Sequence, residues 1–351
     1  MTYSLSIKPY VQQLQVPYRW SKGTQYVRRG ILVRAEWDGA VGWGEAALPP
    51  HVLFDGWAYA AHCSSMLDGL KPGADLLHEL ELREIPARLR CGISSALMSA
   101  QAAHAGLPLA KFLGGEASSK VPVNDLIGDA DPQVCVSRVA DALKIGQDTV
   151  KIKCTTEREL DIARVGAIRE AYPDIRIRLD PNESWDVSWA LEQIRAMEPF
   201  GIDYIEEPLP RGTDLTVYAE LCRETSVAIA LDDSIRSLFH ARRAIELNAA
   251  QVLILKPPRV GGPDRTREII EEARRRNVRC VVTASLETSV GLHVALHCAA
   301  LLPGPIEPCG LGTARFYKSD VADPPPIVGG AMTVPSAPGL GVDLQGWWDT
   351  N

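Results

Sequence analysis

Residues 149–153 read TVKIK, a short run in which aliphatic and charged side chains alternate. The two-residue period is that of a β-strand with one face packed against apolar neighbours. Val150 and Ile152 therefore define the packed face, and Lys151 and Lys153 point to the other side. A strand of this kind, followed by a polar break and a segment with helical spacing, is typical of one βα unit in a parallel sheet.

The same unit recurs along most of the chain. We predict eight strands, at VPVNDLI (121–127), TVKIK (149–153), IRIRLD (175–180), DYIEE (203–207), VAIALDD (227–233), VLILK (252–256), RCVVTAS (279–285) and PIEPCGL (305–311). The segments between them are amphipathic, as where Val187, Leu191 and Ile194 fall on one helical face. Eight such units favour a closed barrel over an open sheet.

The ends of the chain follow a different pattern. Strands SLSIKPYVQQL (4–14) and RRGILVRAEWDGAVGWGEAAL (28–48) precede helical stretches around 56–68 and 92–105. Beyond Asp323 the Pro- and Gly-rich text DPPPIVGG indicates extended chain that returns to the first domain. We therefore predict an α/β protein of three parts, namely an α+β domain at 1–118, a barrel at 119–320 and a C-terminal segment at 321–351.

Composition limits the kind of partner. Hydrophobic residues make up 46% of the 351 residues and charged residues 23%, which is typical of a globular protein with a large core. A net charge of -7 argues against a nucleic-acid or anionic-membrane partner and favours a small molecule. The eight cysteines form no C-x-x-C pair, and no export or anchoring segment is evident, so we expect reduced thiols in a cytoplasmic protein. The oligomeric state is not indicated.

Strand alternation brings five charged side chains to one end of the barrel. They are Lys153, Asp180, Glu206, Asp232 and Lys256. Each follows the outward aliphatic residue of its strand, which selects Glu206 over Glu207 and Asp232 over Asp233. Their separations of 27, 26, 26 and 24 residues each correspond to one βα unit. The carboxyl ends of barrel strands are where such proteins carry their active sites.

Three converging carboxylates imply a cation between them. Without one they would raise one another's pKa, and oxygen ligands without Cys or His suit Mg²⁺, with Mn²⁺ as an alternative. Lys151, Lys256 and the metal would disfavour a charged Lys153 and lower its pKa toward a value useful for a base. Lys151 would shape this electrostatic field or contact a carboxylate substrate directly.

Other interpretations of these residues exist. Charged residues at strand ends also form ordinary ion pairs, and a barrel can serve as a non-catalytic binding module, because fold does not imply activity. His293 and His297 lie four residues apart on a predicted helix, but no nearby acidic residue completes a metal site.

The charged set resembles that of the enolase superfamily, specifically its muconate-lactonizing subgroup. The matching motifs are Lys151-Ile152-Lys153, Asp180-Pro181-Asn182, Glu206-Glu207-Pro208, Asp232-Asp233-Ser234, Lys256-Pro257 and, in the first domain, Gly42-Trp43-Gly44-Glu45. The resemblance covers residues 30–313 and implies a modified (β/α)8 barrel, (β/α)7β, under an N-terminal α+β capping domain. It implies catalytic lysines at 153 and 256 and metal ligands at 180, 206 and 232. Asp233 departs from the glutamate of many relatives.

Within the subgroup the chain is most similar to the o-succinylbenzoate synthase family. Two segments carry that similarity, residues 284–292 (ASLETSVGL) and 309–313 (CGLGT). The resemblance implies that Ser285 and Gly310 hold a succinyl tail, with Asn182 and Arg178 close by. Relatives that racemise N-succinylamino acids use the same lysines and metal, so the catalytic set leaves both reactions open. We further expect residues 14–24 and 47–54 to form loops that close over the barrel mouth.

Overall fold

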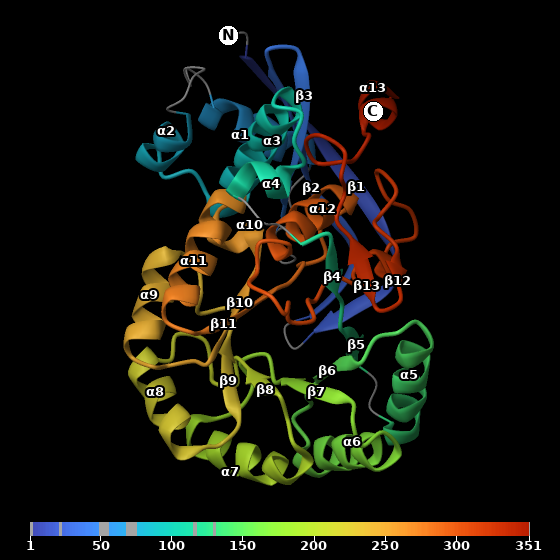
Figure 1. Ribbon diagram of the computed structural model, residues 1–351, viewed down its shortest axis with the longest axis vertical. Coiled ribbons are helices and arrows are strands. Elements are labelled where there is room, and N and C mark those ends of the chain that lie inside the picture. The colour runs from blue at the N-terminus through green and yellow to red at the C-terminus, as the bar shows by residue number, and fades with distance from the viewer. Residues whose placement is uncertain are drawn as a thin grey trace.

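The computed structural model describes residues 3–20, 23–48, 56–67, 76–114, 118–128 and 131–350. The N-terminal part is an antiparallel sheet in the order β1 (Tyr3–Trp20), β2 (Gly23–Trp37), β3 (Ala40–Ala47). Four helices follow it, α1 (Gly56–Leu67), α2 (Leu76–Leu82), α3 (Ala87–His104) and α4 (Leu109–Gly114). Figure 1 shows this part above the barrel. We call it the cap.

Close packing of α3 on β3 explains the glycines of the Gly42-Trp43-Gly44-Glu45 motif. A Cβ atom at Gly44 would lie 1.9 Å from the carbonyl oxygen of Gly92 in α3. Only glycine permits the helix backbone to approach the strand this closely. The motif is therefore a packing device as well as a sequence signature.

A seven-stranded parallel sheet forms the barrel, and it runs in strict sequence order (Figure 1). Its strands are β5 (Asp125–Ile127), β6 (Thr149–Lys153), β7 (Arg176–Asp180), β8 (Tyr204–Glu206), β9 (Ala228–Leu231), β10 (Val252–Leu255) and β11 (Arg279–Val282). The first predicted strand, 121–127, divides into β4 (Lys120–Pro122) and β5. The expected barrel class is confirmed.

Helices on the outside connect these strands. They are α5 (Pro132–Lys144), α6 (Arg158–Ala171), α7 (Val187–Met197), α8 (Leu215–Glu224), α9 (Leu238–Glu246), α10 (Pro257–Val260), α11 (Pro263–Arg275) and α12 (Ser289–Ala299), with short 3-10 turns at Glu198–Phe200 and Ala314–Phe316. Several begin at a residue whose side chain caps the free backbone N–H groups of the first turn, as Asp131, Asp186 and Asp214 do.

The eighth predicted strand, 305–311, is wrong as a strand. Only Cys309 and Gly310 make β-bridges, with Val123 and Thr283, and these two bridges close the ring between β5 and β11. The segment cannot pair along its length, because Pro305 and Pro308 lack the backbone N–H that a β-ladder requires.

The C-terminal segment contacts both parts of the molecule. Strands β12 (Ile327–Val328) and β13 (Ala331–Thr333) form a small sheet with β4, and α13 (Gln345–Thr350) follows. Trp348 of α13 packs against Trp43 of β3, with ring centroids 5.3 Å apart. The tail thus returns to the cap as expected, while the boundaries 1–118, 119–320 and 321–351 stay a prediction.

One expected lid differs from the structure. Residues 14–20 belong to β1, and 23–24 begin β2, so the expected loop at 14–24 is wrong over those residues. The antiparallel pairing of β1 with β2 shifts its register between Gln13 and Tyr18. A shift of this kind lets the hairpin bend without becoming a loop. Residues 21–22 and most of the second expected loop, 49–54, lie outside the described residues.

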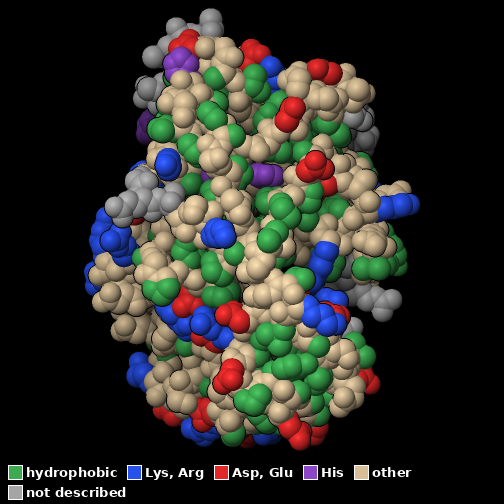
Figure 2. Space-filling view, turned by 45° about the vertical axis from the view of Figure 1, so that its right-hand side comes forward, with side chains coloured by type: hydrophobic (Ala, Val, Ile, Leu, Met, Phe, Trp, Pro, Cys, Tyr) green, Lys and Arg blue, Asp and Glu red, His purple; other side chains and the backbone are tan. Residues whose placement is uncertain are grey.

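The surface and the helices carry two further observations. On the face shown in Figure 2, acidic and basic side chains are interspersed over the lower half of the molecule. Among the described residues, no helix is both long enough and apolar enough to cross a bilayer.

Candidate active site

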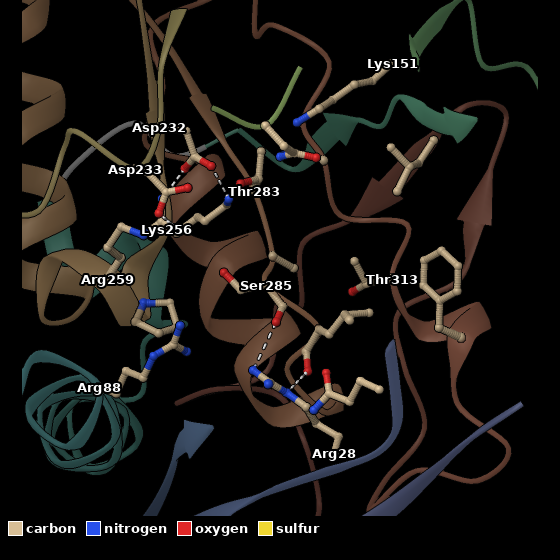
Figure 3. Close-up of a pocket in the computed structure, with 18 of the residues that line it drawn as sticks. Arg28, Arg88, Lys151, Asp232, Asp233, Lys256, Arg259, Thr283, Ser285 and Thr313 are labelled. Atoms are coloured by element: carbon tan, nitrogen blue, oxygen red, sulfur yellow. Dashed lines mark hydrogen bonds and ion pairs between the residues drawn. The ribbon is translucent and has the colours of Figure 1, made fainter. Parts of the chain in front are cut away.

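A cavity of about 790 Å³ lies where the carboxyl ends of the barrel strands face the cap. The barrel contributes Lys153, among others. Figure 3 shows Lys256 and Thr283 of the barrel together with Arg28 and Arg88 of the cap around this cavity. Side chains from elements far apart in the sequence therefore surround one enclosed space, as a ligand site requires.

Lys151 and Lys153 connect two of the predicted carboxylates. The Lys151 Nζ lies 2.7 Å from Asp180 Oδ2 and 2.7 Å from Glu206 Oε1. The Lys153 Nζ lies 2.6 Å from Asp180 Oδ2. All four side chains come from β6, β7 and β8, neighbours in the sheet, which is why alternation along each strand brings them together.

Lys256 and Arg259 hold the third carboxylate. Lys256 Nζ donates to Asp232 Oδ2, and Arg259 donates to Asp232 Oδ1 at 2.5 Å. Lys256 directly follows β10 as the N-cap residue of the short helix α10, which carries Arg259. In the sheet, β7, β8 and β9 separate β10 from β6, so Lys153 and Lys256 enter the cavity from different sides of the ring.

Burial and neighbouring charges set the pKa values in this cluster. Burial raises the pKa of Glu206 to about 7, and the charge of Asp180 adds to that rise. Burial acts in the same direction on Asp180 and Asp232, but Lys151 at Asp180 and Arg259 at Asp232 outweigh it and lower their pKa values. Two carboxylates are thus fixed in their ionised form beside a third that holds its proton more strongly.

The donor chemistry fits a hard divalent cation. Asp180, Glu206 and Asp232 are almost fully buried and offer only oxygen. Glu206 Oε2 is buried and has no hydrogen-bond partner among the described residues, so one oxygen that could ligate a metal ion remains unused. Within the described ranges no three Asp, Glu, His or Cys side chains stand close enough to hold a metal, because the lysine and arginine nitrogens lie between the carboxylates. Positive charge is needed here, and the chain's own cations supply it in this structure.

Glu207 and Asp233, the carboxylates rejected by strand alternation, contact this cluster through the backbone of Asp232 and through Arg259. Glu207 accepts from the backbone N–H groups of Asp232 at 2.7 Å and Ser234 at 3.2 Å. Asp233 pairs with Arg259 at 3.0 Å. Glu207 thereby fixes the backbone at Asp232 and orients the Asp232 side chain in the cluster.

Three of the expected substrate contacts line the cavity, as does Lys151. Asn182 accepts from Lys153 Nζ at 2.8 Å through its side-chain oxygen, and Ser285 and Gly310 also line the cavity. At Gly310 a Cβ atom would lie 2.9 Å from Thr283 Cγ2, so glycine keeps the wall open.

Arg178 is the exception. It is fully buried and does not line the cavity. Its guanidinium pairs with Asp203 at 2.9 Å and with Glu307 at 3.1 Å. Arg178 lies two residues before the strand end, so its inward side chain reaches the barrel interior below the site. Sequence position alone did not distinguish these depths.

Sequence reasoning did not identify Arg28, Arg88 and Arg259. Arg259 stands three residues after Lys256, and that spacing on a helical turn was a usable signal. Arg28 and Arg88 come from a strand and a helix of the cap, and nothing in their local sequence connects them to the barrel.

Fold and site together define a capped (β/α) barrel enzyme that brings two lysines to a cluster of acidic side chains. A family model described as enolase C-terminal domain-like matches residues 135–347, and the chain belongs to the enolase superfamily.

The relatives divide among several reactions. The chain is 27% identical over 351 residues to an o-succinylbenzoate synthase of Bacillus subtilis, covering 95% of this chain and 91% of that one. It is 31% identical over 364 residues to an N-succinylamino acid racemase of Amycolatopsis sp, covering 94% and 91%. A solved dipeptide epimerase of Cytophaga hutchinsonii, complexed with Mg and D-Ala-L-Val, matches with a TM-score of 0.87 and 25% identity, over 97% of this chain and 95% of that one.

Proposed function

We propose that this chain is an o-succinylbenzoate synthase, which dehydrates 2-succinyl-6-hydroxy-2,4-cyclohexadiene-1-carboxylate to 2-succinylbenzoate in menaquinone biosynthesis. The observation that carries the proposal is the placement of Lys153 and Lys256 at the ends of separated strands around one cavity, where Lys153 pairs with Asp180 and Lys256 with Asp232. A proton next to a carboxylate can be removed from one side while positive charge is held on the other.

Asp180, Glu206 and Asp232 would hold Mg²⁺, with Mn²⁺ as an alternative. When bound, the ion would supply a positive charge that stabilises negative charge developing on the substrate carboxylate. The buried and unused Glu206 Oε2 supports this assignment, since a buried carboxylate oxygen without a partner is costly.

Lys153 would act first as base and then as acid. It would take the proton beside the substrate carboxylate and return it to the departing hydroxyl on the same face of the ring. Asn182 accepts from Lys153 at 2.8 Å and orients the amine toward the cavity. Lys256, paired with Asp232, would remain protonated and stabilise the developing anion by its charge. Formation of the aromatic ring makes the dehydration strongly downhill.

A second candidate is N-succinylamino acid racemisation. The same two lysines favour it, because a proton that leaves one face and returns on the other needs a base and an acid on opposite sides. The similarity to the Amycolatopsis racemase supports it equally. A non-catalytic binding module has less support, since the lysines and carboxylates are intact and assembled.

The deciding experiment assays the purified chain with Mg²⁺ on both substrates. Ultraviolet absorbance follows 2-succinylbenzoate formation, and NMR in deuterated water follows α-proton exchange in N-succinylamino acids. Efficient exchange without aromatisation would overturn the dehydration proposal in favour of the racemase. We also propose a cytoplasmic location and a small carboxylate as the only ligand class, without nucleic-acid or membrane partners.

A further inference from the structure

The cavity has a strong excess of positive charge. Nine Lys and Arg side chains line it, against three Asp and Glu side chains. The excess is not confined to the lysines of the barrel, because Arg28 and Arg88 from the cap lie on the far side of Ser285 from Lys151 (Figure 3). A ligand that fills the cavity would therefore meet cations at two separate places.

Arg28 is a structural arginine. It is almost fully buried, and its three nitrogens donate to backbone carbonyl oxygens of Leu286 at 2.8 Å, Leu48 at 2.7 Å and Ser285 at 3.1 Å. These bonds connect β2 of the cap to the loop after β11. Arg28 contributes charge to this end of the cavity, while its fork of donors is engaged by the backbone.

Arg88 differs from Arg28 in having donors to spare. It lies in the first turn of α3, and its one hydrogen bond among the described residues goes from the guanidinium to the carbonyl oxygen of Ala47 at 3.2 Å. No carboxylate in the described ranges lies within ion-pair distance of it. Burial and the charges of Arg28 and Arg259 lower its pKa to about 10 against the opposing charge of Glu287, and Arg88 stays charged near neutral pH.

Three other arginines around the cavity are paired with acidic groups. Arg259 pairs with Asp232, Arg211 with Glu183 at 3.1 Å, and Arg315 with Asp125. A guanidinium that faces a cavity without such a partner is poorly compensated, and a planar fork of N–H donors matches a carboxylate in two-point contact. Arg88 therefore has the chemistry of an anion-binding group that lacks its anion.

We propose that Arg88 binds the distal carboxylate of a dicarboxylate substrate and selects for it over substrates with a neutral tail. The inference rests on the proposed function, because it takes the first carboxylate to lie at the Asp180, Glu206 and Asp232 cluster. It assigns recognition of the tail to a side chain of the cap, in addition to the wall formed by Ser285 and Gly310. The substrate class is then a dianion with its two carboxylates at opposite ends of the cavity.

The test measures binding, so it does not depend on turnover. Isothermal titration with Mg²⁺ present compares 2-succinylbenzoate with 2-butyrylbenzoate, which has the same length of tail but ends in methyl. The wild-type chain is expected to prefer the diacid. Arg88→Gln should weaken the diacid by about 10- to 100-fold and the monoacid by less than about 3-fold, as loss of a charge-assisted bond predicts. Arg88→Lys should recover part of the preference.

Arg236→Gln is the matched control. Arg236 also lines the cavity, but it is exposed and donates to the backbone oxygen of Asp233 at 2.9 Å. Its loss removes the same charge and should change both affinities alike. Equal losses for both ligands in Arg88→Gln, or no preference for the diacid in the wild-type chain, would overturn the proposal. If wild type prefers the diacid yet does not aromatise the cyclohexadiene, the proposed reaction fails while the role of Arg88 stands.

Discussion

The carboxylate of Glu45 in β3 accepts a hydrogen bond of 2.6 Å from the hydroxyl of Thr288, across the contact between cap and barrel. It also accepts from the backbone N–H groups of Thr288 at 3.1 Å and Gly291 at 2.9 Å, at the start of α12. A side chain of the cap thus satisfies the free donors of a barrel helix, a role that a local N-cap residue usually fills. This contact is one of those that hold the cap over the cavity, beside the bonds of Arg28 to Leu286 and Ser285.

Glu45→Gln should lower the free energy of unfolding by about 1–3 kcal/mol, because an NH2 group would replace one acceptor and face a backbone donor. Urea unfolding followed by circular dichroism provides the measurement. Thr288→Val, alone and combined with Glu45→Gln, completes a double-mutant cycle. If the two effects simply add, Glu45 and Thr288 are not coupled and the account of this contact is wrong.

Acid should destabilise the chain through His297. Its Nδ1 accepts from the Ala110 N–H at 3.1 Å, and its Nε2 donates to the carbonyl oxygen of Leu340 at 3.1 Å, so the folded chain needs the neutral ring. Burial lowers the pKa of His297 to about 4. Below pH 6.5 the unfolded chain binds a proton that the folded chain does not, so stability falls as the pH falls from 6.5 toward 4.

The loss of stability from His297 should reach about 3 kcal/mol at the acid end of that window. His297→Asn cannot titrate there, so its unfolding free energy should vary less between pH 7 and pH 4.5 than that of the wild type. Equal pH dependence in the two proteins would contradict the assignment. Because both ring nitrogens of His297 have backbone partners, a metal role for His293 and His297 is also without support.

Removal of divalent metal with EDTA should abolish activity, and Mg²⁺ or Mn²⁺ should restore it. Asp180→Asn should reduce turnover by about 1,000-fold or more, equivalent to about 4 kcal/mol of lost stabilisation. The substitution sits at a strand end and not in a packed layer, so the circular dichroism spectrum should stay unchanged. Full activity in metal-free protein would refute the metal assignment.

The two lysines should respond differently to arginine. Lys256→Arg keeps the positive charge but hardly deprotonates at neutral pH, so it should retain measurable dehydration and lose racemisation. Lys153→Arg should lose both, because the base itself is gone. The measurement is the rate of aromatisation beside the rate of α-proton exchange for each variant. Equal loss of dehydration in both variants would mean that Lys256 does more than hold a charge.

Strand alternation predicted which charged side chains lie together, because it depends on a local rule. An aliphatic residue that packs outward forces the next side chain inward, and this rule alone placed Lys153 beside Asp180 and both Lys153 and Asp232 along one cavity. It gives direction but not depth, which is why Arg178 was expected near the substrate. The rule also says nothing about the hydrogen-bond partners that an inward side chain will find.

Long-range placement could not be read from the sequence. Arg88 reaches the cavity because α3 packs tightly on β3, and that packing is a property of two elements separated by forty residues or more of chain. The eighth strand failed for the opposite reason, since its aliphatic content suggested a strand while its prolines forbade pairing. At that position the missing N–H groups of the prolines outweigh the hydrophobicity of the segment.

The barrel is a seven-stranded sheet whose two edge strands are joined by a short irregular segment. Four backbone hydrogen bonds made by Cys309 and Gly310 span the join between β5 and β11, with lengths of 2.8–3.1 Å. Gly310 and Thr283 at this join also line the cavity, so the closure of the ring coincides with one wall of the candidate active site. A side chain added at Gly310 would press on Thr283 and act as a wedge in the join. A substitution at Gly310 therefore acts on the cavity wall and on the closure of the barrel at the same time. A change of ligand specificity at this position is also a change in the stability of the closed barrel.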